Sequence, residues 1–169
     1  MTLTFHATAV PGVLVATGTA GSGDGAEPIF AAADAPGEAS DRLVRAELFQ
    51  LAGKGALRGL YLTPGQVVLR CVHGEVWAVA VDLRADSPAF RRSVGLDLAA
   101  SGPGLVVPQG CAHGFVALCG RATVLRLAAT DAPGAGLRWD DPSLAVAWPV
   151  SPVIEAAADR GFQSQVLPV

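Results

Sequence analysis

The chain has 169 residues, of which 51% are hydrophobic, and a formal net charge of −3. This length and composition predict one globular domain that buries a sizeable core. The small charge and the scattered basic residues exclude the electrostatic footprint of a nucleic-acid-binding or membrane-surface protein. No apolar run reaches the roughly 18 residues of a membrane-spanning helix, so we expect neither nucleic acid nor membrane as a partner.

The chain has three cysteines, Cys71, Cys111 and Cys119, an odd number at spacings that match no disulfide framework. Such usage is typical of a reducing compartment. We therefore expect free thiols and a cytoplasmic protein.

The first half of the chain holds a contrast in composition. Residues 18–41 are rich in Gly, Ala, Ser, Asp and Pro and hold almost no large apolar residue, which predicts a flexible loop. Dense apolar patterning follows over residues 43–128. Within it, β-branched and apolar runs predict strands at residues 66–72, 75–82, 93–98, 104–107, 113–118 and 122–128.

The turns between these runs indicate the architecture. His73-Gly74 separates the first two runs, which predicts a tight hairpin. Many short strands without a long helical period are typical of an antiparallel sandwich or barrel. One short helix is expected at residues 153–160, with Pro152 before it and Gly161 as its stop signal. We see no second domain, and a single jelly roll over residues 1–169 fits the pattern.

Several segments between about residues 54 and 149 carry a family resemblance because they follow one another in a fixed order. They are ALRGL at 56–60, HGEVWAVAVDLR at 73–84, SPAF at 87–90, VPQGCAHGF at 107–115, TD at 130–131, LRWDDP at 137–142 and AWP at 147–149. Together they resemble the dTDP-4-dehydrorhamnose 3,5-epimerase family. The resemblance implies an all-β, cupin-type jelly roll (a double-stranded β-helix), usually a homodimer. Each segment also fits a purely structural role, as a turn or a helix cap.

The family reaction removes a proton beside the 4-keto group of a nucleotide-bound 6-deoxysugar and returns it from the opposite face, which requires a base and an acid. The family's base is a histidine at the end of an Arg-Gly-Leu-His stretch, where this chain has Tyr61. Its acid is a tyrosine near Thr-Asp. Tyr61 is the only tyrosine here, and Ala132-Pro133 follows Thr130-Asp131 directly, so the acid is absent.

Tyr61 is a poor substitute for a histidine base. Ionising a tyrosine with a pKa near 10 costs roughly 4 kcal/mol at neutral pH, a cost that histidine does not carry. Tyr61 is therefore either a catalytic group in an altered role or a barrel-lining residue with a hydrogen-bonded hydroxyl. By its spacing, Asp159 corresponds to the aspartate that orients the family's base.

Contacts to the substrate are also altered. The family has a polar stretch before the catalytic loop that grips a diphosphate, and this chain has ELFQLA at 47–52, of which Glu47 is our candidate ligand contact. We therefore expect a largely apolar pocket mouth. Arg58 and His113 remain at family positions, and either group can meet a phosphate or carboxylate. His113 also fits as a core histidine, and Trp77 is a candidate pocket wall or an ordinary core residue.

We expect no metal and no cofactor. Pro108-x-Gly110-x-x-His113 resembles half of a metal-cupin signature, and Cys71-x-His73 and Cys111-x-His113 would place side chains on one strand face. An acidic ligand at a matching spacing is missing, and His73 lies in a predicted turn.

Three functions stay open. The first, which we favour, is a repurposed family member that acts on a small molecule in specialised-metabolite biosynthesis without the usual His/Tyr chemistry, with Tyr61, Arg58 and His113 as its principal site residues. The second is a dTDP-4-keto-6-deoxyhexose 3- or 3,5-epimerase that uses altered residues. The third is a non-catalytic partner protein, which predicts an exposed apolar patch and no ligand cavity.

Overall fold

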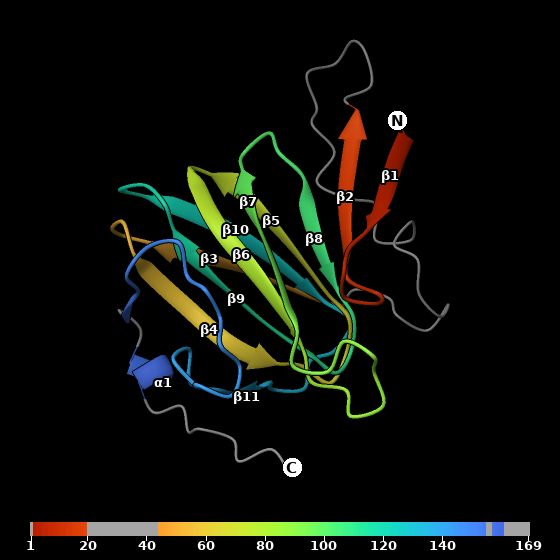
Figure 1. Ribbon diagram of the computed structural model, residues 1–169. Helices are drawn as coiled ribbons and strands as arrows, with labels where there is room; N and C mark the ends of the chain where they lie inside the picture. Colours follow the sequence, from red (N-terminus) through yellow and green to blue (C-terminus); the bar gives the residue numbers. More distant parts are fainter. Residues whose placement is uncertain (1, 20–43, 155–156, 161–169) are drawn as a thin grey trace.

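The computed structural model describes residues 2–19, 44–154 and 157–160, and in that part of the chain two six-stranded sheets face each other (Figure 1). The first sheet has the order β1-β2-β8-β5-β10-β3, and the second has the order β11-β4-β9-β6-β7 with β12 also paired to β4. All pairings are antiparallel except that of β12 with β4. This is the predicted all-β jelly roll.

The elements in chain order are β1 (Thr2–Ala7), β2 (Leu14–Thr19), β3 (Arg45–Leu51), β4 (Ala56–Leu62), β5 (Val67–His73), β6 (Glu75–Asp82), β7 (Ser93–Ala99), β8 (Gly104–Val107), β9 (Cys111–Ala117), β10 (Ala122–Ala128), β11 (Ala135–Gly136), β12 (Val153–Ile154) and α1 (Ala157–Arg160). The six strands expected from residue 66 to residue 128 are all present, with bounds that shift by at most two residues.

The prediction of a hairpin at His73-Gly74 is wrong. Strand β5 lies in the first sheet between β8 and β10, and β6 lies in the second sheet between β7 and β9. The turn at Gly74, which has a φ of 73°, therefore carries the chain from one sheet to the other. Local sequence marks the turn, but it does not decide which strands pair.

The C-terminal helix is shorter than expected. Val153 and Ile154 extend the second sheet beside Ala56 and Leu57, and the helix begins only at Ala157. Pro152 therefore precedes a strand rather than a helix. The expected stop at Gly161 and most of the expected loop at 18–41 lie outside the described residues, while Gly18 and Thr19 end β2.

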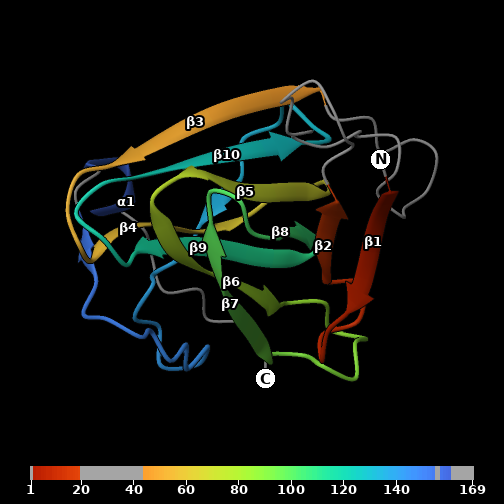
Figure 2. The same ribbon diagram turned by 90° about the horizontal axis from the view of Figure 1, so that it is seen from above.

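The main core lies between the two sheets, and side chains alternate across each strand because successive residues point to opposite faces. On β6, Val76, Ala78 and Ala80 point into this core, together with Cys111 and Phe115 of β9. Figure 2 shows the interior as the space between β3 and β10 on one side and β6 and β9 on the other.

A second cluster covers the outer face of the second sheet. Leu137, Leu144, Val146 and Trp148 from the segment after β11 pack against outward-facing residues such as Val79. The segment covers the sheet from outside. The site described next lies on the other face of this sheet, between the two sheets.

Candidate functional site

Tyr61 lies near the end of β4 and faces His113 of β9 across the strand pair. Their ring centroids are 6.0 Å apart. The pairing of β4 with β9 is irregular between Arg58 and Tyr61, and Gly59 occupies this irregularity with a φ of 106°. A Cβ at Gly59 would lie 2.8 Å from the backbone oxygen of His113, so the close approach of the two strands requires glycine here.

The hydroxyl of Tyr61 donates a short hydrogen bond to Oδ1 of Asp159, which α1 places beside the end of β4. Asp159 is buried, and its Oδ2 accepts a second hydrogen bond from the backbone N–H of Gly59 at 3.3 Å. Arg58 Nη1 lies 3.9 Å from the same oxygen. The residue that spacing assigned as the orienting aspartate thus contacts the residue in the position of the base.

This contact keeps Tyr61 protonated. Burial raises the pKa of Tyr61 well above its usual value, and the hydrogen bond to Asp159 raises it further, while Arg58 and Arg126 oppose these effects more weakly. A phenol with a raised pKa is a hydrogen-bond donor at neutral pH and a poor proton acceptor.

His113 is fully buried and points into the space between the sheets. Burial lowers the pKa of His113 to about 3, and the nearby cation of Arg126 lowers it too. Arg126 Nε donates to His113 Nε2 at 3.2 Å, so the neutral ring carries its proton on Nδ1. That Nδ1 has no hydrogen-bond partner among the described residues. Only one ring nitrogen of His113, Nε2, therefore has a hydrogen-bond partner among the described residues, and this partner is a side chain rather than backbone.

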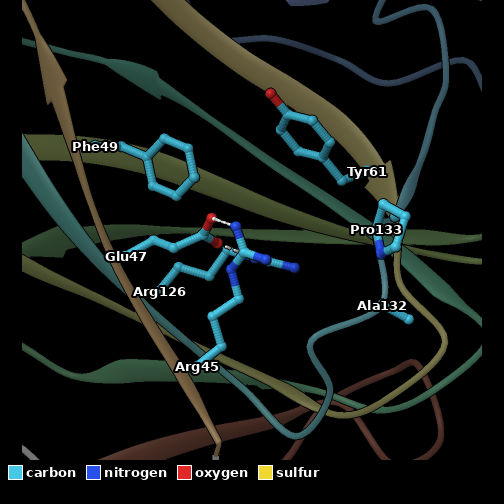
Figure 3. A pocket seen from close by; sticks show the side chains of 8 residues that line it. Arg45, Glu47, Phe49, Tyr61, Arg126, Ala132 and Pro133 are labelled. Atoms are coloured by element: carbon cyan, nitrogen blue, oxygen red, sulfur yellow. Dashed lines mark hydrogen bonds and ion pairs between the residues drawn. The ribbon is translucent and has the colours of Figure 1, made fainter.

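A charged cluster forms the opposite side of the site. The carboxylate of Glu47 on β3 bridges two arginines, with Oε1 2.8 Å from Arg45 Nη2 and Oε2 in a short ion pair with Arg126 Nη1. Strands β3 and β10 are paired neighbours with Arg126 directly opposite Glu47. Figure 3 shows Glu47 and both guanidinium groups facing the cavity across from Tyr61.

A cavity of about 220 Å³ lies between these two sides. Its lining consists of Arg45, Glu47, Phe49, Tyr61, Arg126, Ala132, Pro133 and Gly134. The lining keeps apolar groups, as expected of the pocket mouth, but Arg45 and Arg126 also bring two cations into it. Both are residues that sequence reasoning missed.

The remaining predicted site residues lie beside or away from this cavity. Arg58 stacks over the ring of Phe49, with its Cζ 4.9 Å from the centroid, and so lies behind the lining. Trp77 does not line this cavity. It points to the outer face of the second sheet, where its ring packs against Trp148 at a centroid distance of 5.4 Å, because residue 77 has the opposite parity to the inward-facing residues of β6.

Among the described residues, no group of three or more His, Cys, Asp or Glu side chains is arranged to hold a metal ion. Cys111 shares the inward face of β9 with His113, but burial raises the pKa of its thiol to about 11. The Cys71 thiol donates to the backbone oxygen of His73 at 3.1 Å.

Among the described residues, no helix has the length and apolar composition of a membrane span.

Two facing, mainly antiparallel sheets with a cavity between them define the fold of this protein as that of a cupin. A profile of the dTDP-4-dehydrorhamnose 3,5-epimerase family matches residues 30–165. The chain therefore belongs to this family. The relatives of the chain that belong to the family are dTDP-sugar epimerases.

Two relatives illustrate the similarity. The chain is 37% identical over 113 residues to the dTDP-4-dehydrorhamnose 3,5-epimerase of Salmonella typhimurium, a match that covers 62% of each chain. It is 40% identical over 107 residues to the enzyme of the same name from Pseudomonas aeruginosa, covering 59% of each. The match thus spans about three fifths of the length of these relatives.

Solved structures extend the similarity to nearly the whole chain. The dTDP-4-dehydrorhamnose 3,5-epimerase of Bacillus anthracis, solved with TDP and PPi bound, is 25% identical with a TM-score of 0.83, and the alignment covers 97% of this chain and 100% of that one. NovW, a 4-keto-6-deoxy sugar epimerase from the novobiocin gene cluster of Streptomyces spheroides, is 27% identical with a TM-score of 0.76, covering 97% and 88%.

Proposed function

We propose that this protein is a repurposed member of its family, which binds and acts on a small molecule in specialised-metabolite biosynthesis without abstracting a proton through residue 61. The observation that carries the proposal is the hydrogen bond from Tyr61 to Asp159. It uses the phenol as a donor and raises its pKa, whereas carbanion chemistry beside a ketone requires an acceptor at this place.

His113 supports the same reading. After Tyr61, His113 is the other candidate for a base at this site. The lone pair of its Nε2 already accepts a hydrogen bond from Arg126. Its pKa of about 3 makes the ring a very weak base. The two groups that face each other are thus both neutral at neutral pH, and neither is an available base: the one proton of the phenol is donated to Asp159, and the basic nitrogen of the imidazole accepts from Arg126.

Proton exchange into a family substrate tests this proposal. The purified protein is incubated in heavy water with dTDP-4-keto-6-deoxyglucose, and the sugar C3 and C5 protons are followed by NMR against a buffer blank. We expect no exchange above the blank for the wild type. Tyr61→His places an imidazole beside Asp159, and a histidine base needs no costly ionisation at neutral pH. Exchange in this variant alone would show that the wild type binds the sugar nucleotide and lacks only the base, whereas no exchange in either protein is expected if the cavity does not take a diphosphate.

Tyr61→Phe is the matched control, because it keeps the ring and removes the hydroxyl. Exchange in the wild type that disappears in Tyr61→Phe would contradict the proposal and establish Tyr61 as a working base.

One observation favours a second candidate, a dTDP-4-keto-6-deoxyhexose 3- or 3,5-epimerase with altered residues. Arg45 and Arg126 place two cations at the cavity, and arginine is well suited to binding phosphate. Wild-type exchange in the experiment above selects this candidate. A purely non-catalytic partner protein predicts no ligand cavity, and the cavity speaks against it.

We also propose that the protein is a cytoplasmic homodimer. Strand β3 ends the order of the first sheet, and Leu48 on it has an exposed fraction of 64%. An exposed edge strand with apolar side chains is a surface on which a second chain can pair. Sedimentation equilibrium of the wild type and Leu48→Glu measures this, and a wild-type monomer would contradict it.

A further inference from the structure

The charged side of the cavity includes a side-chain carboxylate, that of Glu47. Glu47 holds one carboxylate oxygen against Arg45 and the other against Arg126, which is the way an arginine pair holds a bound carboxylate or phosphate. The side chain of Glu47 is 26% exposed and that of Arg126 only 11%. The contact of Glu47 with Arg126 is therefore largely shielded from solvent, and charge interactions are stronger there than in bulk water. The contact with Arg45, whose side chain is 46% exposed, is more open.

The local charge follows from these three residues. Two guanidinium groups and one carboxylate leave a formal charge of +1 at the lining. Arg58 adds little to it, since the side chain lies over Phe49 and beside the buried carboxyl of Asp159. A net charge of +1 neutralises one negative charge of a ligand. The further negative charge of a polyanion would not be neutralised at this lining, and Glu47 would repel it.

Donors remain for such a ligand. Each guanidinium has five N–H groups. Among the described residues, Arg126 uses Nε on His113 and Nη1 on Glu47, and Arg45 uses Nη2 on Glu47 and Nη1 on the backbone oxygen of Asp131. Each arginine can thus donate to a further acceptor without releasing Glu47.

The cavity is modest in size. Its volume of about 220 Å³ lies below the range of roughly 300–1,000 Å³ that is usual for ligand pockets, and it is partly open to solvent. The cavity therefore has room for a compact ligand or for one part of a larger ligand.

We propose that Glu47 is a built-in counter-ion of Arg45 and Arg126 that makes the cavity favour ligand groups with a single negative charge, such as a monocarboxylate, and disfavour diphosphates. Glu47 is then a residue that determines ligand specificity by repulsion as much as by contact. The inference rests on the proposed function in one respect, namely that the ligand enters this cavity.

Inorganic pyrophosphate is the probe that tests the charge rule, and its binding is measured by isothermal titration calorimetry at constant ionic strength. Glu47→Gln keeps the length of the side chain and one oxygen acceptor but removes the negative charge. We expect it to bind pyrophosphate at least tenfold more tightly than the wild type, a factor that equals about 1.4 kcal/mol. The gain should shrink as salt is added, because it is electrostatic.

Glu75→Gln is the matched control. Glu75 begins β6 and is exposed, so the substitution changes the net charge of the protein by the same amount away from the cavity. We expect wild-type affinity. Adding Arg126→Met to Glu47→Gln should abolish the gain, because it removes the more shielded of the two cations that would receive the anion.

Glu47→Ala repeats the test without an amide in the cavity, in case Glu47→Gln disturbs the fold, and thermal melting establishes that each variant is folded. Equal pyrophosphate affinity in wild type and both Glu47 variants overturns the inference, as does a gain of the same size in Glu75→Gln. Neither result depends on proton exchange, so failure of the charge rule and failure of the proposed function are separable.

Discussion

Replacing His113 should change how the stability of the protein depends on pH. The ring is fully buried, its pKa is lowered to about 3, and the causes are burial and the cation of Arg126. An unfolded histidine has a pKa near 6.5. Between these two values the unfolded chain binds a proton that the folded protein does not, so stability falls as the pH is lowered through this window.

The size of the effect follows from the two pKa values. Linkage with a folded pKa of about 3 and an unfolded pKa of about 6.5 gives a loss of roughly 2 kcal/mol between pH 7 and pH 5 from this one residue. Most domains have a total stability of only about 5–15 kcal/mol. The loss is therefore large enough to be measured.

Urea denaturation of wild type and His113→Gln at pH 7 and pH 5 is the assay. Glutamine can present an oxygen to Arg126 where His113 presents Nε2, and it does not titrate. We expect the variant to be less stable at pH 7, but to lose about 2 kcal/mol less than the wild type on going to pH 5. Contributions from His6, His73 and the carboxyl groups are common to both proteins and cancel. Equal losses in the two proteins would refute the placement of a neutral, buried His113.

Two further predictions concern stability. Tyr61→Phe removes the donor to the buried carboxyl of Asp159, and it should lower the free energy of unfolding by about 1–3 kcal/mol in urea denaturation; an unchanged midpoint would show that the hydrogen bond contributes nothing. Gly95→Ala would place a Cβ 2.0 Å from a ring carbon of Trp77, whereas Gly120→Ala meets nothing within 4 Å. We expect a melting temperature lowered by several degrees for the first and unchanged for the second, and equal melting temperatures would count against the packing of Trp77.

Much of the fold could be predicted from the sequence because the strands from residue 66 onward are runs of apolar and β-branched residues bounded by glycine. The pairing of those strands could not. His73-Gly74 has the local chemistry of a hairpin, but β5 and β6 join different sheets, since burial of both inner faces outweighs the local preference. The same holds for Val153 and Ile154, which read as helix and form a strand through contact with β4.

The candidate site was predicted in part. Tyr61 and His113 were singled out through the order of the motifs and Asp159 through its spacing, and the structure brings Tyr61 into contact with Asp159 across 98 positions of sequence. Arg45 and Arg126 were missed. A signal existed, because Arg126 is a charged residue inside an otherwise apolar strand, and Arg45 and Glu47 share a face at a spacing of two. The closure of β3 on β10 that brings them together is not visible in either segment alone.

Titration of Tyr61 tests the central claim, that this residue is a protonated hydrogen-bond donor and not a base. Because the chain contains a single tyrosine, labelling tyrosine with carbon-13 at Cζ gives one NMR signal, which shifts when the phenol ionises. In urea the midpoint should lie near the ordinary value of about 10. In the folded protein we predict that the signal remains that of the neutral phenol through about pH 10, because burial and Asp159 raise the pKa. A folded-state midpoint below about 8 would contradict the account, since Tyr61 would then be ionised often enough to act as the base.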